Sequence, residues 1–166
     1  MRDTVDYPRR HWLLNALFAV TPVAVAAVLG NLATIPNIPG WYAGLIKPAF
    51  SPPNWIFGPV WAVLYVMIAY AFFRVLHAPR FMPGRSGAIA LFIVQMALNA
   101  SWSWAFFAAR NPGAGVAVIA AMWLAIVLTL LAFRRVDGLA SLCLAPYLAW
   151  VSFAAVLNVA IWRLNS

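Results

Sequence analysis

Residues 111–133 have the sequence NPGAGVAVIAAMWLAIVLTLLAF, in which no side chain carries a charge. Arg110 precedes this stretch, and Arg134 and Arg135 follow it. An α-helix rises ~1.5 Å per residue, so about 20 apolar residues are enough to cross the ~30 Å hydrocarbon core of a bilayer. Pro112 suits the first turn of a helix, where its missing N–H costs nothing. The stretch therefore predicts a membrane-spanning helix.

Charge-free windows recur along the chain, at 11–46, 48–73, 86–109, 111–133 and 138–162. Each window is long enough for one spanning helix, and we expect these helices at 12–32, 54–76, 87–109, 113–133 and 140–162. The short alternating segments of a transmembrane β-barrel are missing from the sequence. The predicted fold class is therefore all-α, an integral membrane bundle of five transmembrane helices. We divide the chain into a basic N-terminal extension, 1–11, and one transmembrane domain, 12–165.

The composition excludes most soluble classes of protein. Of the 166 residues, 66% are hydrophobic and 8% are charged, and the mean hydropathy is +0.89. A soluble domain has about 25% charged residues. The net charge of +8 on so apolar a chain indicates contact with the lipid bilayer and no nucleic-acid partner. Cys143 is the single cysteine, which excludes an internal disulfide framework and a cysteine-based metal cluster.

Lysine and arginine are distributed unequally between the two predicted membrane faces. One face holds Arg2, Arg9, Arg10, Arg74, Arg80, Arg85, Arg134 and Arg135. The other face holds only Lys47, Arg110 and Arg163. Because cytoplasmic segments carry the excess of basic residues, we predict a multi-pass protein with a cytoplasmic N-terminus and an outward C-terminus.

The connection between the first two predicted helices, residues 33–52, is unusually long. Connections of this length in compact domains are often lids or binding loops. Residues 41–46 within it, between Pro39 and Pro48, are consistent with a short interfacial helix. The alternative is a passive connector whose aromatic side chains sit at the lipid headgroups. We favour a lid over a pocket.

Three tryptophans lie deeper than an interfacial aromatic belt requires. At 1.5 Å per residue, Trp61, Trp102 and Trp150 lie about 12, 10 and 18 Å below the outer ends of their helices. Amide side chains share faces with them: the two stripes are Gln95–Asn99–Trp102 and Tyr147–Trp150–Ala154–Asn158. The stripes indicate either a shared pocket beneath the long loop or hydrogen bonds between helices.

Other sequence features indicate close helix packing or argue against particular kinds of catalytic and transport activity. Gly113, Ala117, Ala121 and Ala125 repeat every four residues, which permits close helix approach within the bundle or in a dimer. The middle of each predicted span lacks Asp, Glu, Lys, Arg and His, which argues against ion pumping and proton-coupled transport. His11 and His77 flank the spans as solvated residues, with axial haem ligation as the alternative. The sequence contains no nucleophile–base set and no metal-ligand cluster.

Several motifs together resemble the TspO/MBR family, which includes tryptophan-rich sensory proteins of bacteria and the mitochondrial translocator protein, or peripheral benzodiazepine receptor. The motifs are WYAGL at 41–45, KP at 47–48, PP at 52–53, GPVW at 58–61 and PYLAW at 146–150. Trp55, the Leu98-Asn99 pair with Trp102, the Leu157-Asn158 pair and Trp162-Arg163 with Asn165 also match. The resemblance runs from about residue 12 to residue 165.

The resemblance implies a five-helix bundle, often a homodimer, that binds porphyrins, haem-related tetrapyrroles and other planar apolar ligands. The function implied is that of a receptor, a sensor or a transporter-like protein. No cofactor is required, and porphyrin or haem enters as the ligand. The positions that match the family's pocket are Tyr42, Trp61, Asn99, Trp102, Trp150 and Ala154. Helical spans favour the bacterial inner membrane over the barrel-dominated outer membrane.

Two alternatives accompany this reading. Some members degrade protoporphyrin in light and oxygen, and the resemblance then assigns catalytic roles to Trp61 and Trp150. A structural membrane scaffold, with the aromatic residues as packing, is the other alternative. Sterol binding is not expected, because Val159 stands where the sterol-recognition pattern has tyrosine between Leu157 and Arg163.

Overall fold

A computed structural model describes residues 7–166 of the chain, with side chains from Trp12 onward. Within residues 7–166 there is no β-strand, and the long helices are α1 (Tyr7–Thr34), α2 (Asn54–His77), α3 (Arg85–Ser103), α4 (Pro112–Val136) and α5 (Gly138–Leu164). Short 3-10 turns form at Ile35–Asn37 and Tyr42–Gly44, and a π-helical segment at Trp104–Ala108 follows α3. The predicted basic extension, 1–11, lies outside the described side chains.

The predicted all-α membrane bundle is confirmed. Within the described residues, five helices are long and apolar enough to cross a membrane, and the chain is a multi-pass integral membrane protein. The helices begin and end within a few residues of the expected positions. Asn111 and Asp137 fix the starts of α4 and α5, because their side chains accept hydrogen bonds from the backbone N–H groups of Ala114 and Ala140.

Two segments show detail that the sequence did not predict. The span expected at 87–109 is confirmed at Arg85–Ala108, and its last turn widens into the π-helical segment at Trp104–Ala108. The short helix expected at 41–46 is reduced to the single turn Tyr42–Gly44, after which Leu45 takes an extended conformation.

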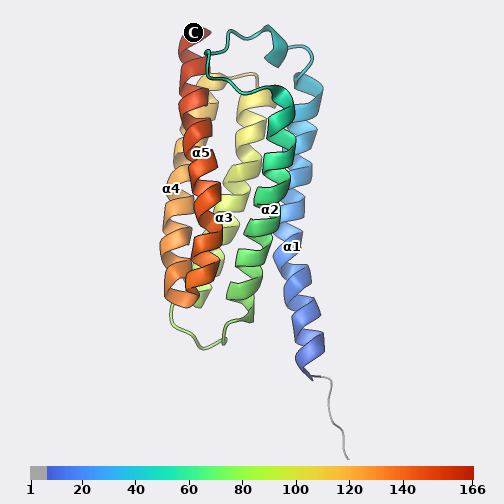
Figure 1. Cartoon of the computed structure of the whole chain (residues 1–166), viewed down its shortest axis with the longest axis vertical. Helices are drawn as coiled ribbons and strands as arrows, with labels where there is room; N and C mark the ends of the chain where they lie inside the picture. The colour runs from blue at the N-terminus through green and yellow to red at the C-terminus, as the bar shows by residue number, and fades with distance from the viewer. Residues whose placement is uncertain (1–6) are drawn as a thin grey trace, which may run out of the picture.

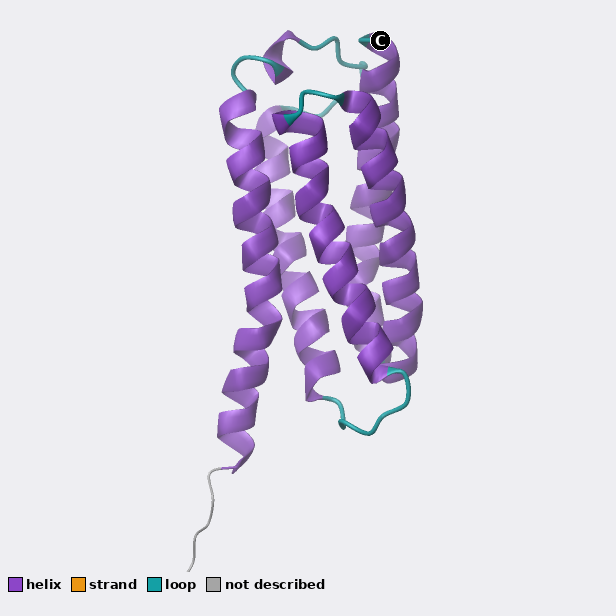
Figure 2. Cartoon of the chain, turned by 180° about the vertical axis from the view of Figure 1, so that it is seen from behind, coloured by secondary structure: helices purple, strands orange, loops and turns teal. Residues whose placement is uncertain are grey.

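The helices form a closed ring of neighbours. α1 packs against α2 and α3, α4 lies between α3 and α5, and α5 returns to α2. The 35–53 loop, the turn at 109–111 and the C-terminus lie at one end of the bundle, which we call the loop end (Figure 1, Figure 2). The 78–84 connection lies at the opposite end (Figure 1).

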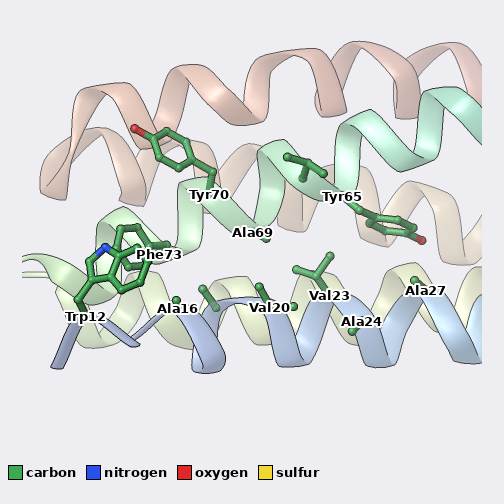
Figure 3. A pocket seen from close by; sticks show the side chains of 12 residues that line it. Trp12, Ala16, Val20, Val23, Ala24, Ala27, Tyr65, Ala69, Tyr70 and Phe73 are labelled. Carbon is green, nitrogen blue, oxygen red and sulfur yellow. The ribbon is translucent and has the colours of Figure 1, made fainter. Parts of the chain in front are cut away.

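An apolar groove of about 630 Å³ runs along the outside of the bundle between α1 and α2. Trp12 and Phe73 close it at the opposite end, with ring centroids 6.0 Å apart. Ala27 of α1 and Tyr65 of α2 lie at the end of the groove nearer the loop end (Figure 3).

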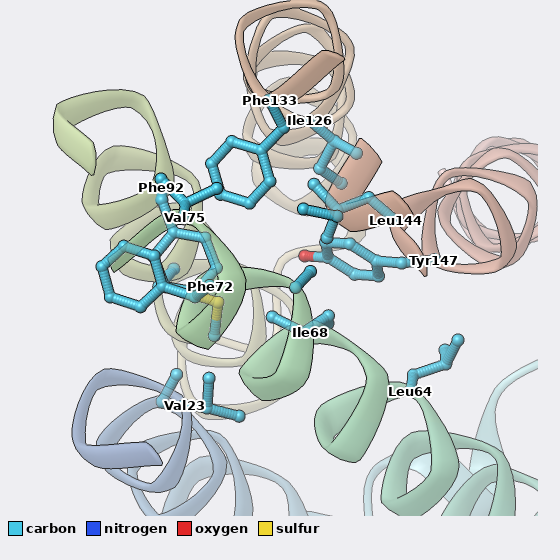
Figure 4. Packing of buried hydrophobic residues seen from close by; sticks show 14 of the residues in the cluster. Val23, Leu64, Ile68, Phe72, Val75, Phe92, Ile126, Phe133, Leu144 and Tyr147 are labelled. Carbon is cyan, nitrogen blue, oxygen red and sulfur yellow. The ribbon is translucent and has the colours of Figure 1, made fainter. Parts of the chain in front are cut away.

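A hydrophobic core of buried side chains from all five helices runs through the bundle, and Figure 4 shows part of it. Phe72 of α2 stacks on Phe92 of α3 with centroids 3.8 Å apart. The buried residues of α2 begin at Leu64, whereas Val60 and Trp61 are only partly buried where they pack against this core. Helix α2 therefore has its buried side chains between Leu64 and its C-terminal end, and its N-terminal part, toward the loop end, is more open.

Candidate functional site

A cavity of about 540 Å³ occupies the loop end of the bundle. Helices α1, α2, α3 and α5 supply its walls, the π-helical segment adds Phe106 and Phe107, and the 35–53 loop adds Ile35, Ile38 and Tyr42. Ligand pockets typically have volumes of roughly 300–1,000 Å³ and mostly apolar walls with a few polar groups. The size and position of the cavity fit a small-molecule site.

All six residues expected at a pocket line this one cavity. They come from four separate parts of the chain, namely the loop (Tyr42), α2 (Trp61), α3 (Asn99 and Trp102) and α5 (Trp150 and Ala154). The two amide-bearing stripes therefore face each other, as the shared-pocket interpretation requires. Gln95 is fully buried in the core and does not line the cavity.

Asn99 joins two tyrosines at the cavity wall. Its Oδ1 accepts a hydrogen bond from the Tyr65 hydroxyl at 3.1 Å, and its Nδ2 donates to the Tyr147 hydroxyl oxygen at 3.0 Å. These bonds connect α3 to both α2 and α5. Asn99 therefore also has the structural role that the alternative interpretation gave to buried amides.

Asn158 performs the same task nearer the loop. The Trp102 indole N–H donates to Asn158 Oδ1 at 3.0 Å, and Asn158 Nδ2 donates to the Pro112 carbonyl at 2.9 Å. This chain of bonds ties α3 and the start of α4 to α5. The indole plane of Trp102 is thereby fixed on the cavity wall.

Trp150 differs from Trp102 because its indole N–H is buried without a partner. Among the described residues, the buried side-chain atoms lacking a hydrogen bond are Ser51 Oγ, both amide atoms of Gln95 and Trp150 Nε1. Of these residues only Trp150 lines the cavity. An unpaired buried donor costs about 1–3 kcal/mol. Because this nitrogen is shielded from water-sized molecules, a ligand in the cavity meets the ring of Trp150 and not its N–H group.

The 35–53 loop is packed against the bundle by aromatic contacts. The Tyr42 ring is 6% exposed and lies 5.4 Å from the Phe107 ring, while Trp41 lies 5.5 Å from Phe106. Lys47 Nζ lies 4.4 Å from the centroid of the Tyr42 ring, in cation–π distance. The loop therefore places a positive charge beside a residue that lines the cavity.

The sequence analysis missed several lining residues. Tyr65, Phe106 and Phe107 line the cavity beside the expected residues. Tyr65 lies four residues after Trp61 and Phe106 four after Trp102, so helical spacing was a usable signal for both. Phe107 follows Phe106 directly, and the π-helical turn lets both neighbours face inward. No spacing rule for an α-helix predicts that arrangement.

Only part of the row of small residues on α4, from Gly113 to Ala125, packs inside the bundle. Gly113 lies against Trp162 of α5 and Ala125 is buried, whereas Ala117 and Ala121 are exposed on the outside of the bundle. The closest approach occurs at Gly115, outside this row. A Cβ atom there would lie 2.9 Å from both Asn158 Oδ1 and Phe106.

The cavity walls have aromatic, aliphatic, amide and hydroxyl groups. The lining residues include no charged side chain and no His, Cys or Met. Such walls offer flat apolar surfaces and a few hydrogen-bond donors, which suits binding of a planar apolar molecule.

Comparison with known proteins places the cavity within a recognised family region. A model of the TspO/MBR family matches residues 18–163. The tryptophan-rich protein TspO of Chlorobaculum tepidum is 45% identical over 125 residues, which cover 75% of this chain and 79% of that protein. TspO of Archaeoglobus fulgidus is 37% identical over 93% of this chain and 99% of its own.

The human translocator protein is also similar, with 38% identity over 75% of this chain and 75% of its own length. Every residue that lines the cavity, from Ala27 to Ile161, falls inside the range matched by the family model.

Proposed function

Because the chain belongs to the TspO/MBR family of membrane proteins, we propose that it binds a porphyrin-type tetrapyrrole in the cavity beneath the 35–53 loop. Tyr42, Trp61, Asn99, Trp102, Trp150 and Ala154 form the binding surface. Sensing or transport of the ligand depends on this binding step.

The observation that carries the proposal is that the indole rings of Trp61, Trp102 and Trp150 line one cavity beneath the loop. Phe57 meets Trp150 edge-on at 5.7 Å, and this keeps the indole in place. A planar macrocycle covers the faces of these rings and removes them from contact with water.

The loop gives the ligand an orientation. A porphyrin has an apolar ring and one edge with two carboxylates. Lys47 beside Tyr42 supplies a cation at the loop end, whereas the cavity walls have none. The carboxylate edge therefore faces the loop, and the opposite edge points into the bundle. A metal-free porphyrin suits the walls better than haem, because the usual axial ligands His, Cys and Met are not among the lining residues.

A second candidate is light-dependent porphyrin degradation that uses Trp61 and Trp150. Trp61 has oxidisable rings on two sides, Tyr65 at 5.2 Å and Tyr147 at 6.1 Å. This cluster favours electron loss from a cavity residue, and the same experiment tests both candidates.

The test is a titration of the detergent-purified protein with protoporphyrin IX in the dark, followed by tryptophan quenching. We expect saturable quenching in the wild type and a Kd about three- to tenfold higher for Trp150→Phe, since the smaller ring covers less of the ligand. Trp104→Phe is the matched control, because Trp104 is 48% exposed and does not line the cavity. Linear quenching that is alike in all three proteins would mean partitioning into the micelle and would overturn the proposal.

Illumination of the same complexes separates binder from enzyme. A degrading enzyme converts bound protoporphyrin to a new product in the wild type and fails to do so in the Trp61→Phe/Trp150→Phe variant. Equal spectral decay in both, with porphyrin still bound, rejects the enzymatic candidate and leaves the binding proposal intact.

A further inference from the structure

The outer groove and the inner cavity share two residues. Ala27 of α1 and Tyr65 of α2 line both the groove of about 630 Å³ and the cavity of about 540 Å³. Figure 3 shows Tyr65 at the loop-end limit of the groove with Ala27 on the facing helix. The two spaces are therefore neighbours along the seam between α1 and α2, and these two side chains form the boundary.

The seam is weakly tied near this boundary. Alanines dominate the α1 side of the groove, and small side chains interdigitate little with a neighbouring helix. Among the described side chains, the hydrogen bond between α1 and α2 is that of Asn15 with His77 at 3.4 Å, at the far end of the groove. Separation of the helices beside Ala27 and Tyr65 breaks no hydrogen bond between α1 and α2.

The loop end is tied more strongly. Asn165 forms two hydrogen bonds of 2.9 Å with the Ile46 backbone, and Arg110 donates to Asn37 Oδ1 at 3.3 Å. Tyr42 and its neighbour Trp41 add the aromatic contacts described above. A ligand that left through the loop would have to break these contacts together.

We propose that the α1–α2 seam is the lateral entrance of the cavity and that the groove holds the apolar ligand on its way from the bilayer. Tyr65 is the gate. Its ring forms the boundary, and its hydroxyl is held by a single bond of 3.1 Å to Asn99 Oδ1. Rotation of this one side chain joins the two spaces. The inference rests on the proposed function, since it concerns access to that same cavity.

The occupant follows from the walls of the groove. They are almost entirely hydrocarbon and include Trp12, Val20, Val66 and Phe73. A molecule that dissolves in the bilayer meets no desolvation barrier on this path. A water-soluble molecule without an apolar ring gains nothing from it.

Two exposed valines on α2 give a matched test. Val66 lines the groove and is 70% exposed, whereas Val63 lines neither space and is 60% exposed. Both positions accept a larger side chain without disturbing the core.

The probe is protoporphyrin IX dimethyl ester, preloaded in phosphatidylcholine vesicles. The protein is studied in the same vesicles, and binding is followed by stopped-flow tryptophan quenching.

We expect Val66→Trp to lower the association and dissociation rates together, by about fivefold or more, because an obstacle on the path changes neither end state. The Kd stays within about twofold of the wild type, and Val63→Trp behaves as the wild type. Ala24→Phe, an exposed groove residue on α1, gives the same result from the other helix.

Three outcomes overturn the entrance. The first is equal rates in Val66→Trp and Val63→Trp. The second is a changed Kd in Val66→Trp, which would make the groove part of the bound site. The third is faster association and dissociation of the porphyrin ester in Asn165→Ala, which would indicate that the ligand passes through the loop. Each of these leaves saturable wild-type binding intact, whereas non-saturable wild-type binding would instead overturn the proposed function itself.

Discussion

The side chain of Asn165 pairs with the backbone of Ile46 as a second peptide strand would. Its Oδ1 accepts from the Ile46 N–H at 2.9 Å, and its Nδ2 donates to the Ile46 carbonyl at 2.9 Å. The same Nδ2 also donates to the Ile161 carbonyl in the last turn of α5 at 2.7 Å. One side chain thus joins the end of the last helix to the loop that covers the cavity.

Replacement of Asn165 should release the loop locally. Asn165→Ala removes both bonds to Ile46, and at about 0.5–1.5 kcal/mol each this predicts roughly tenfold faster amide exchange around Ile46. Hydrogen exchange with mass spectrometry over residues 41–50 is the measurement. Asn165→Asp keeps the acceptor and loses the donor, so its effect should lie between wild type and alanine. Unchanged exchange in both variants would show that aromatic packing alone holds the loop.

Substitution of Lys47 should affect only ligands that carry carboxylates. Lys47→Met keeps the length of the side chain and removes the charge, so protoporphyrin IX should bind about threefold more weakly, as expected for a partly solvated ion pair. The Kd of its dimethyl ester should not change. Titration of both porphyrins against both proteins gives the comparison, and an equal loss for the two would contradict the orientation we assign to the ligand.

A methyl group at position 115 should displace two residues that line the cavity. In Gly115→Ala the new Cβ would meet Asn158 Oδ1 and Phe106 at 2.9 Å, and overpacking of this kind costs about 1–3 kcal/mol. Because Asn158 holds Trp102, ligand affinity should fall as well as thermal stability. Gly87→Ala is the control, since nothing lies within 4 Å of a Cβ there. We expect it to be neutral or stabilising by up to about 1 kcal/mol.

Acid should weaken the opposite end of the bundle through Asp137. Arg74 donates to this carboxylate at 2.8 Å and holds the pKa of Asp137 below its ordinary value. The resulting stability is present above about pH 4 and is lost as the pH falls through the lower folded pKa. Asp137→Asn, which keeps a capping oxygen for α5, should lack this acid-dependent loss.

Melting temperatures of wild type, Asp137→Asn and Asp137→Ala between about pH 7 and pH 3 test this expectation. At neutral pH the alanine variant should be the least stable, because it also loses the helix cap, worth about 1 kcal/mol. Parallel pH profiles for the wild type and Asp137→Asn would show that the ion pair contributes nothing.

The spans and their order could be predicted because the bilayer imposes one strong rule. Charge-free windows mark the helices, and the helix starts follow from local groups such as Asn111 and Asp137, whose side chains bond to the first backbone N–H groups. Asn99, Trp102, Trp150 and Ala154 were within reach because amides and indoles repeat at helical spacing on α3 and α5. Tyr42 was expected at the pocket from the family resemblance, and Trp61 from that resemblance and its depth in the membrane. The structure brings those two stripes to one cavity.

The backbone conformation at the loop end could not be predicted from the sequence because tertiary contacts determine it. Local sequence was consistent with a short helix at 41–46, but packing of Tyr42 on Phe107 and bonding of Ile46 to Asn165 leave only one turn. The π-helical turn at Trp104–Ala108 likewise depends on burying both Phe106 and Phe107. Neither arrangement has a signal in the nearby sequence.

The uncharged lining of the cavity has an electrical consequence. Work against a membrane potential is ~2.3 kcal/mol per elementary charge per 100 mV, and it applies only to charge that moves through the field. None of the lining residues carries a formal charge, so a neutral guest that enters or leaves displaces no gating charge. The fraction of protein that holds such a ligand therefore does not depend on the membrane potential. It depends on the concentration of the ligand in the membrane.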